Sequence, residues 1–418
     1  MGLIIAVWQA GQNYNEGSCM YQSDSKPRVL YVSHHAPWPT FSGGRLREAQ
    51  LIPRLLDHAG IDLVAVTRTL KVDERAARDI CLPGLTVKLF DDEAPPGVAP
   101  GRDSAPARHY LGDLARQWSF SAVHVEGHYL SPLLPKELRR RALVVEHNIE
   151  STLLLQRENT GPATPVTKSE ILRVRRQEEA AWREAAGVVV LTAEDAGTIS
   201  TRVPEVTVHT VPSGWDHIGL RRPGANGAVR PGTLRDPRLL FLANYAYSPN
   251  EDGVRWLLGE IFPRVRAQHP GARLRLVGAN LNAGIAAQAR RWPGVEIVGW
   301  VPAVEDELDH ADLVLCPLRI GGGIKIKTIE ALRRGCLLVS TSIGAQGLSN
   351  SMRSAIAIAD EADSFATHIV RLCQDDKARQ AMVYALHYAQ HLMPTWDAAA
   401  AQIRQLWMDS AQERLAHA

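Results

Sequence analysis

The sequence predicts an α/β protein built from two doubly wound domains that face a central cleft. At 418 residues the chain exceeds the usual size of a single domain. Short apolar, β-branched runs alternate with longer amphipathic stretches, and this alternation is typical of parallel sheets covered by helices. Residues 213–237 are rich in glycine and proline and divide the alternation into two series, so we expect them to form a linker.

The first series, residues 27–212, is expected to form the N-terminal domain. Residues 1–26 precede it, and we expect a flexible extension because they lack the basic start and cleavage site of a signal peptide. The expected strands are Arg28–Ser33, Leu63–Thr67, Thr86–Phe90, Ala122–Val125, Ala142–Glu146 and Gly187–Leu191, and the expected helices are Arg45–His58 and Lys168–Ala186.

The second series, residues 238–392, repeats the alternation. Its expected strands are Leu239–Asn244, Arg273–Val277, Val295–Val298, Leu313–Cys316, Leu337–Thr341 and Ala355–Ala359, and its expected helices are Val254–Gln268, Ala283–Arg291, Lys325–Arg334 and Phe365–Cys373. A last helix over Trp396–Arg414, within residues 393–418, is expected to pack back on the N-terminal domain. Ligands of open α/β sheets bind outside the carboxyl ends of the strands, so the cleft is the expected site.

The composition argues against several classes of protein. The 47 basic and 45 acidic residues leave a net charge of +2, so no nucleic-acid partner is expected. None of the five cysteines forms a C-x-x-C pair, which argues against a zinc site or a disulfide framework and suits a cytoplasmic location. No apolar run reaches the length of a membrane span, so we expect membrane contact to be peripheral at most.

A glycine-rich segment in the second series carries the strongest chemical signal. Gly321, Gly322 and Gly323 follow an apolar strand and directly precede a predicted helix. Glycines let a ligand approach the backbone closely, and the free N–H groups at the start of a helix favour an anion. We therefore predict a cradle for a diphosphate.

Charged residues of the following helix extend this cradle. Lys325 and Lys327 add positive charge, and their alternate spacing places them on different faces, so we expect Lys325 to be the one that reaches the phosphates. Glu330 can accept two hydrogen bonds from the 2′- and 3′-hydroxyls of a ribose, each worth roughly 1.5–3 kcal/mol. The alternative is a bare glycine turn followed by a surface glutamate.

These residues resemble the donor-site motif of GT-B glycosyltransferases in the group 1 family, also called glycosyltransferase family 4, and above all the bacterial exopolysaccharide-type sugar transferases. The resemblance is strong from about residue 238 to 350 and weaker in the N-terminal half. It implies a GT-B fold of two Rossmann-like domains. It also implies transfer of a sugar, with retention, from a nucleoside diphosphate sugar in the C-terminal half to a sugar-containing or other hydroxyl acceptor in the N-terminal half. No Asp-x-Asp motif ends a strand, so we expect neither a metal nor another cofactor.

The sequence departs from the family pattern at two places. Gly322 stands where relatives often carry a glutamate, so contacts to the sugar are expected from the backbone N–H groups of Gly321–Ile324. The loop Asn244–Asn250 lacks the arginine and lysine that many relatives use to bind the diphosphate. Neutralisation of the phosphates is then expected to rest on Lys325 and the helix dipole.

Aromatic and polar residues near this loop complete the expected donor site. Asn244 is expected to contact the donor, while Tyr245 and Tyr247 either pack on the base or acceptor or belong to the core or a lid. Trp300 follows a strand where relatives bind the base, and it either stacks on the base or is a core tryptophan.

Two groups of residues in the N-terminal half match the family less specifically. Gly43 and Gly44 resemble a glycine loop that approaches the donor phosphate, with a helix start behind it. Relatives also place a histidine or similar polar group near the sugar, and Glu126 and His128 both fall close to that position. His147 ends the next strand and also faces the cleft, so these three are the catalytic candidates, each with a purely structural role as the alternative.

Three other functions compete with sugar transfer. A nucleotide-sugar 2-epimerase shares the architecture, and a catalytically silent sugar-binding relative is compatible with Gly322 and the base-free loop. A dinucleotide-dependent oxidoreductase is disfavoured, because no strand is followed by G-x-G-x-x-G. The sugar, the nucleotide, the acceptor and the oligomeric state stay open.

Overall fold

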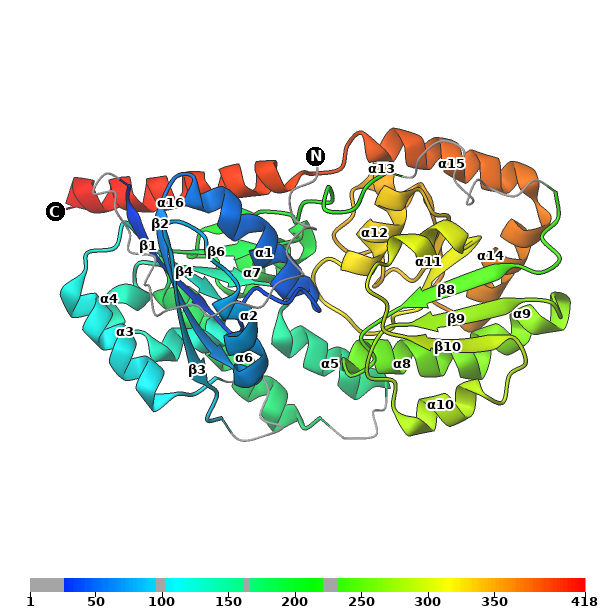
Figure 1. The fold of residues 1–418 in the computed structure, drawn as a ribbon, viewed down its shortest axis with the longest axis horizontal. Coiled ribbons are helices and arrows are strands. Elements are labelled where there is room, and N and C mark those ends of the chain that lie inside the picture. The colour runs from blue at the N-terminus through cyan, green and yellow to red at the C-terminus, as the bar shows by residue number, and fades with distance from the viewer. Residues whose placement is uncertain (1–25, 95–101, 161–165, 221–231, 418) are drawn as a thin grey trace.

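The computed structural model describes residues 26–94, 102–160, 166–220 and 232–417. Within these ranges the chain forms two α/β domains that lie side by side, each with a parallel sheet between layers of helices (Figure 1). The fold class predicted from the sequence is confirmed. Residues 1–25 of the predicted extension and 221–231 of the predicted linker lie outside the described residues.

The N-terminal domain contains a 7-stranded sheet in the order β3-β2-β1-β4-β5-β6-β7. Its strands are β1 (Arg28–Ser33), β2 (Gly60–Thr67), β3 (Leu85–Asp91), β4 (Ala122–Glu126), β5 (Ala142–Glu146), β6 (Gly187–Val190) and β7 (Val208–Thr210). The helices are α1 (Gly43–Leu56), α2 (Leu70–Arg78), α3 (Ala105–Gln117), α4 (Lys136–Arg139), α5 (Glu150–Thr160), α6 (Lys168–Glu184) and α7 (Ala193–Arg202), with a 3-10 helix at His128–Leu133. Every residue of β2, β4, β5 and β6 is buried, as expected for strands covered on both faces.

The C-terminal domain contains a 6-stranded sheet in the order β10-β9-β8-β11-β12-β13. Its strands are β8 (Arg238–Leu242), β9 (Arg273–Val277), β10 (Val295–Gly299), β11 (Leu313–Cys316), β12 (Leu338–Ser340) and β13 (Ile356–Ile358). Its helices are α8 (Ser248–Trp256), α9 (Phe262–Gln268), α10 (Ala283–Ala289), α11 (Glu305–His310), α12 (Ile326–Arg334), α13 (Asn350–Arg353), α14 (Ala362–Gln374) and α15 (Asp376–Gln390).

The helix predicted over residues 254–268 differs most from the structure. It begins earlier, at Ser248, where Pro249 occupies the first turn and needs no N–H partner. A π-helical turn at Leu257–Ile261 then separates α8 from α9. Pro263 follows directly and lacks the N–H group that a regular helix would require at this point, which accounts for the interruption.

Helix α12 begins one residue later than predicted, and this start is important for the site. Lys325 has extended backbone angles and occupies the N-cap position, but its side chain makes no capping hydrogen bond. At the other end Gly335 adopts a left-handed conformation (φ 82°) and ends the helix. The first N–H groups of α12 are therefore left for a partner outside the helix.

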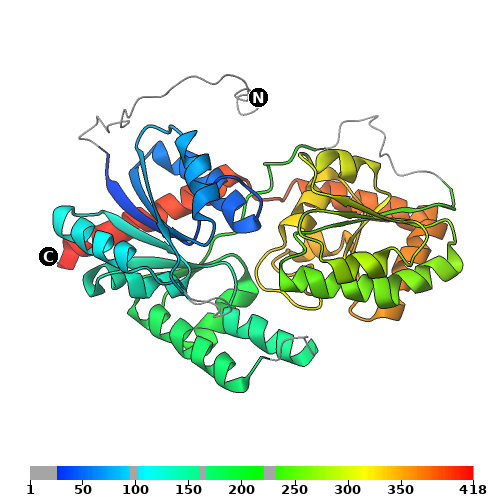
Figure 2. The same cartoon turned by 60° about the horizontal axis from the view of Figure 1, so that its bottom comes forward.

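The last helix, α16 (Trp396–His417), returns from the C-terminal domain and lies along the N-terminal domain (Figure 1, Figure 2). Trp396, Ile403 and Trp407 are buried in one apolar cluster with residues of β1 and β2. Where the chain crosses back, Trp215 N–H donates to Pro394 O at 3.0 Å, so the two connections between the domains lie together. Among the described helices, none combines the length and the apolar character that a membrane span requires.

Replacing Trp396 by alanine is expected to destabilise the protein by about 3–5 kcal/mol, because a fully buried indole would leave a cavity. Guanidinium-induced unfolding followed by circular dichroism measures this loss. Met408→Ala, on the same helix but 47% exposed, is the control and should change the free energy of unfolding by less than about 0.5 kcal/mol. Equal effects of the two substitutions would contradict the packing described for α16.

Candidate functional site

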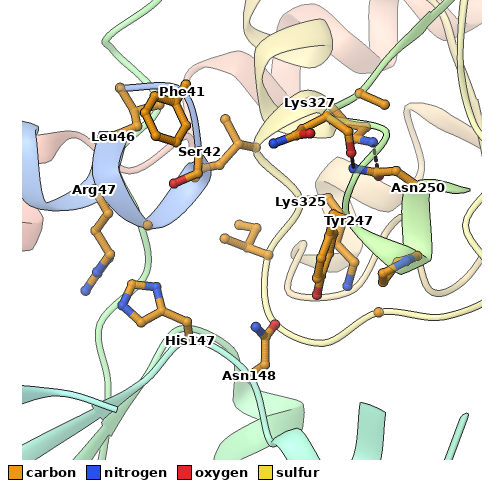
Figure 3. Close-up of a pocket in the computed structure, with 18 of the residues that line it drawn as sticks. Phe41, Ser42, Leu46, Arg47, His147, Asn148, Tyr247, Asn250, Lys325 and Lys327 are labelled. Carbon is orange, nitrogen blue, oxygen red and sulfur yellow. Dashed lines mark hydrogen bonds between the residues drawn. The ribbon is translucent and has the colours of Figure 1, made fainter. Parts of the chain in front are cut away.

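A cavity of about 860 Å³ lies between the two domains and is lined from the carboxyl ends of both sheets (Figure 3). This volume is within the usual range for small-molecule sites. Loops after β1, β4 and β5 form its N-terminal wall, and the loops after β8, β9, β10 and β11 form its C-terminal wall. The cavity therefore lies at the carboxyl ends of the strands, where the sequence predicts the ligand to bind.

The glycine loop before α12 lies at the centre of the C-terminal wall. Gly321, Gly322 and Ile324 line the cavity, whereas Gly323 faces the N-terminal domain. Gly323 has a φ of 58°, and a Cβ atom at this position would lie 2.1 Å from the main-chain oxygen of His147. Only glycine satisfies both the backbone conformation and this contact.

Two side chains of the N-terminal domain hold the same loop. Gln156 Oε1 accepts a hydrogen bond of 2.8 Å from the N–H of Gly321. The Asn148 amide, oriented with its nitrogen toward the loop, donates to Gly322 O at 2.9 Å. The glycine loop is thus positioned by both domains. The N–H group of Gly321, which was expected to contact the sugar, already has a protein partner.

The two lysines line the cavity in different ways. Lys325 Nζ donates to Gly322 O at 3.0 Å, to Gly323 O at 2.8 Å and to Gln346 Oε1 at 3.0 Å, so it ties the glycine loop to α12. Lys327 Nζ makes one hydrogen bond, of 2.5 Å, to Asn250 Oδ1 at the start of α8 (Figure 3). Burial lowers the pKa of each ammonium group to about 8.

Lys327 lies beside the loop that lacks the family's arginine and lysine. Its ammonium group is 4.7 Å from the centre of the Phe241 ring, at the end of β8. The hydrogen bond to Asn250 brings it to the N-terminus of α8, and Asn250 Nδ2 in turn donates to Asn244 O at 2.8 Å. Positive charge is therefore present at this loop, although it comes from α12.

Glu330 lines the cavity one turn further along α12 and is linked to the domain connection. Its Oε1 atom is 3.4 Å from Nε2 of His217, and Nδ1 of His217 accepts a hydrogen bond of 3.2 Å from the Trp396 indole. His217 could not be predicted as a partner of Glu330, because it lies 113 residues away within the predicted linker.

The structure settles two of the aromatic alternatives. Tyr245 is 1% exposed and its hydroxyl donates to Phe241 O, so it belongs to the core. Tyr247 is 46% exposed and lines the cavity. Trp300 also lines the cavity and is 69% exposed, so its interpretation as a core tryptophan is wrong.

The start of α1 forms the opposite wall. Gly43 and Gly44 both line the cavity, and a Cβ atom on Gly43 would lie 2.9 Å from the side chain of Ile326, in the first turn of α12. The N-termini of α1 and α12 therefore lie against one another beside the cavity. Arg47 also lines it, but its guanidinium group donates to Ser213 Oγ at 3.2 Å and to Val211 O at 3.1 Å.

Of the three catalytic candidates, only His147 faces the cavity. Its Nε2 atom is 2.5 Å from Oε2 of Glu126, which is fully buried behind it. His128 is buried as well, with Nδ1 3.0 Å from Oε1 of Glu146. Glu126 and His128 thus lie behind the cavity wall, where neither can touch a substrate directly.

The electrostatics of His147 depend on Glu126. Burial alone lowers the pKa of His147, but the charge of Glu126 and the hydrogen bond to it raise the pKa, and the net shift is upward. Burial raises the pKa of Glu126, yet His147 and His124 lower it further, to well below its usual value. The buried carboxylate of Glu126 therefore favours the cationic form of the His147 imidazole.

Carboxylates and histidines below the cavity are close enough to hold a cation. Glu48, Glu126 and His147 each bring one ligand atom within 4.8 Å of the others, as do His34, His35 and Glu48. Several of these atoms already have protein partners, since Glu126 bonds to His147 and Ser33 donates to Glu48 at 2.9 Å. The expectation that no metal is required stays a prediction.

A family comparison identifies the C-terminal part of the chain. Residues 236–375 match the family described as "Glycosyl transferases group 1". The chain contains a group 1 glycosyltransferase domain. The resemblance and the enzyme class predicted from the sequence are confirmed.

One curated relative matches part of this chain. A protein described as an uncharacterized 44.6 kDa protein in the cps region of Klebsiella pneumoniae is 27% identical over 145 residues. The match spans 33% of this chain and 37% of that protein, so it covers well under half the length of the relative.

Solved structures show the same fold over almost the whole chain. Sucrose-phosphate synthase from Thermosynechococcus elongatus is similar with a TM-score of 0.68 at 15% identity, over 94% of this chain and 100% of that one. HepE from Anabaena, solved with UDP and glucose, has a TM-score of 0.63 at 14% identity, over 91% and 99%. A UDP-forming trehalose-phosphate synthase from Burkholderia xenovorans has a TM-score of 0.63 at 12% identity, over 92% and 99%. These likenesses establish the GT-B fold.

Gly323→Ala is expected to separate the two domains by displacing the glycine loop from His147. A side chain in the left-handed region costs about 1–3 kcal/mol, and the contact with the His147 carbonyl adds to it. Small-angle X-ray scattering should report a larger radius of gyration than for the wild type. Gly232→Ala is the matched control, because Gly232 also has a positive φ, of 73°, but has no atom within 4 Å of an added Cβ. Identical scattering by all three proteins would contradict the contact.

Proposed function

We propose that this protein transfers a sugar from a nucleoside diphosphate sugar to an acceptor hydroxyl, with retention of configuration and without an essential metal. The observation that carries the proposal is the start of α12, where an uncapped helix N-terminus, Lys327 and Glu330 line one cavity. A diphosphate and a ribose are the two groups that such an arrangement recognises.

In this proposal the diphosphate lies at the N-terminus of α12, between Lys327 and the glycine loop. The ribose hydroxyls donate to Glu330, and the base lies against the exposed face of Trp300. Two of the solved neighbours support a uridine nucleotide, since HepE was solved with UDP and the trehalose-phosphate synthase is described as UDP-forming. UDP-glucose is therefore the first donor to test.

The chemical step does not require a strong protein base. The bond between the anomeric carbon and the diphosphate oxygen breaks, a bond from the same carbon to the acceptor oxygen forms, and the acceptor proton passes to the departing diphosphate. Lys327 and the helix N-terminus stabilise the charge that develops on the leaving group. Lys325 holds the glycine loop in place through its three hydrogen bonds.

His147 is assigned to the sugar rather than to the acceptor proton. As a cation paired with Glu126, it donates a hydrogen bond to a sugar or phosphate oxygen in the cavity. Glu126 acts as a positioning residue, because it is buried and reaches the cavity only through His147. The close contact between the domains excludes water and so limits hydrolysis of the donor.

Transfer assays with the UDP, GDP, TDP and ADP conjugates of glucose test the proposal. A panel of saccharide acceptors is supplied with and without EDTA, products are identified by mass spectrometry, and the anomeric configuration is assigned by NMR. One preferred nucleotide, a retained configuration and no effect of EDTA are expected. An isomerised sugar nucleotide formed without acceptor would instead indicate an epimerase, and nucleotide binding without any product would indicate a silent relative.

Lys327→Met and Glu330→Gln are each expected to raise the dissociation constant of UDP by roughly 10-fold or more, since each removes a charge-assisted hydrogen bond. Isothermal calorimetry measures the affinity. Arg333→Met, on the same helix but outside the cavity, is the control and should bind UDP like the wild type. Wild-type affinity in both site variants would remove the basis for the donor site.

UDP binding is expected to weaken as the pH rises from 7 to 9. Both lysines have a pKa of about 8 and are charged below that pH, so the attraction for the diphosphate is lost above it. The protonated fraction of such a group falls about 10-fold over this interval, and the dissociation constant should rise correspondingly. The profile of Lys327→Met should be flatter than that of the wild type; a flat wild-type profile would rule out a role for these ammonium groups.

A further inference from the structure

We infer that Glu150 recognises the acceptor, and that the acceptor group bound at this part of the cavity is an uncharged, polyhydroxylated sugar rather than a sugar phosphate. The inference rests on the proposed sugar transfer and names the acceptor class for the same cavity. The cavity has an N-terminal and a C-terminal wall. The donor groups described above occupy the C-terminal wall, so the second substrate has to bind against the N-terminal wall.

Glu150 is the first residue of α5 and follows β5 closely. Its side chain lines the cavity and is only partly buried. Its carboxylate makes no hydrogen bond or ion pair with the residues that the structure describes, unlike Glu126, Glu146 and Glu178 nearby. A carboxylate in a cavity without a protein partner is available to accept hydrogen bonds from ligand hydroxyls.

The neighbouring groups on this wall are hydrogen-bonding groups with little positive charge. Glu146 also lines the cavity, as do His34, His35 and Tyr129. Burial lowers the pKa of His34 well below its usual value and that of His35 to about 3, so both imidazoles are neutral at pH 7. The Tyr129 hydroxyl is 3.1 Å from His34 Nδ1.

The cations near this wall are already engaged. Arg47 donates to Ser213 Oγ and Val211 O, and Arg102, which lies 5.8 Å from the centre of the Tyr129 ring, is paired with Asp92 at 3.5 Å. His147 is paired with Glu126 and is assigned above to the donor. By contrast, the C-terminal wall presents two lysines to the cavity. A phosphate on the acceptor would therefore meet carboxylates on the N-terminal wall, where a charge repulsion is weakly screened by solvent.

Glu150 can form hydrogen bonds with sugar hydroxyls whether its carboxyl group is ionised or protonated. Burial raises its pKa, His128 lowers it, and the nearby Glu146 and Glu178 raise it, with a net value of about 7. An ionised carboxylate accepts from hydroxyls, and the protonated acid both donates and accepts. Tyr247, which lines the cavity from the C-terminal wall, offers an aromatic face for the apolar side of a sugar ring.

Calorimetric titration of acceptors into the UDP-saturated protein tests the inference without relying on turnover. The probes are glucose, mannose and galactose, their methyl glycosides, and the 6-phosphates of the three sugars. A neutral probe should bind more tightly than its phosphate. Glu150→Ala should weaken binding of that neutral probe by roughly 10-fold or more, with a smaller loss for Glu150→Gln and unchanged affinity for UDP.

Glu158→Ala, on the same helix but outside the cavity, is the control and should bind acceptor like the wild type. The inference is overturned if sugar phosphates bind more tightly, if no neutral probe binds, or if Glu150→Ala leaves acceptor affinity unchanged. Its failure is distinguishable from failure of the proposed function. Acceptor binding that depends on Glu150 without any transfer would contradict only the function, and transfer that is indifferent to Glu150 would contradict only this inference.

Discussion

Gly323 lies against the main-chain carbonyl of His147, and this contact between the domains leaves no room for a side chain. The loop that carries it leads into α12, and Lys325 fixes the same loop through the carbonyl groups of Gly322 and Gly323. His147, on the other side of the contact, is the catalytic candidate that faces the cavity. The two walls of the site are therefore in direct contact. The relative positions of the groups that would hold the donor and the acceptor depend on this contact.

The C-terminal helix α16 supports both walls from behind. The Trp407 indole donates to His124 Nδ1 at 3.2 Å, and His124 Nε2 lies 2.9 Å from Glu126, the partner of His147. The middle of the helix is thus linked to the N-terminal wall. Its first residue is Trp396, whose indole bonds to His217 beside Glu330, and so the start of the helix is linked to the C-terminal wall. A helix that contributes no cavity-lining residue therefore holds together polar groups of both domains.

The fold could be predicted from the sequence, and so could the part of the site whose residues lie close together in the chain. The buried strands are mostly apolar, β-branched runs, and the glycine loop, Lys327 and Glu330 lie within ten residues of one another, so their spacing could be interpreted directly. Roles that depend on distant partners could not be predicted. Nothing near His217 indicates that it lies beside Glu330, and nothing near Glu150 indicates that its carboxylate lacks a partner. Likewise, residue type does not show whether a tryptophan at the end of a strand faces the core or the cavity. Trp300, which follows Gly299 (φ 84°), proves to be exposed in the cavity.

The two connections between the domains lie together, with Trp215 bonded to Pro394 and Gly214 packed against Trp396. Because the two connections are adjacent, a hinge motion of the domains would turn about this edge. Helices α5 and α8 lie on the side of the molecule opposite α16 in Figure 1, and such a turn would move them apart. Such a turn would widen the cavity most on the side of α5 and α8 and least beside the two connections.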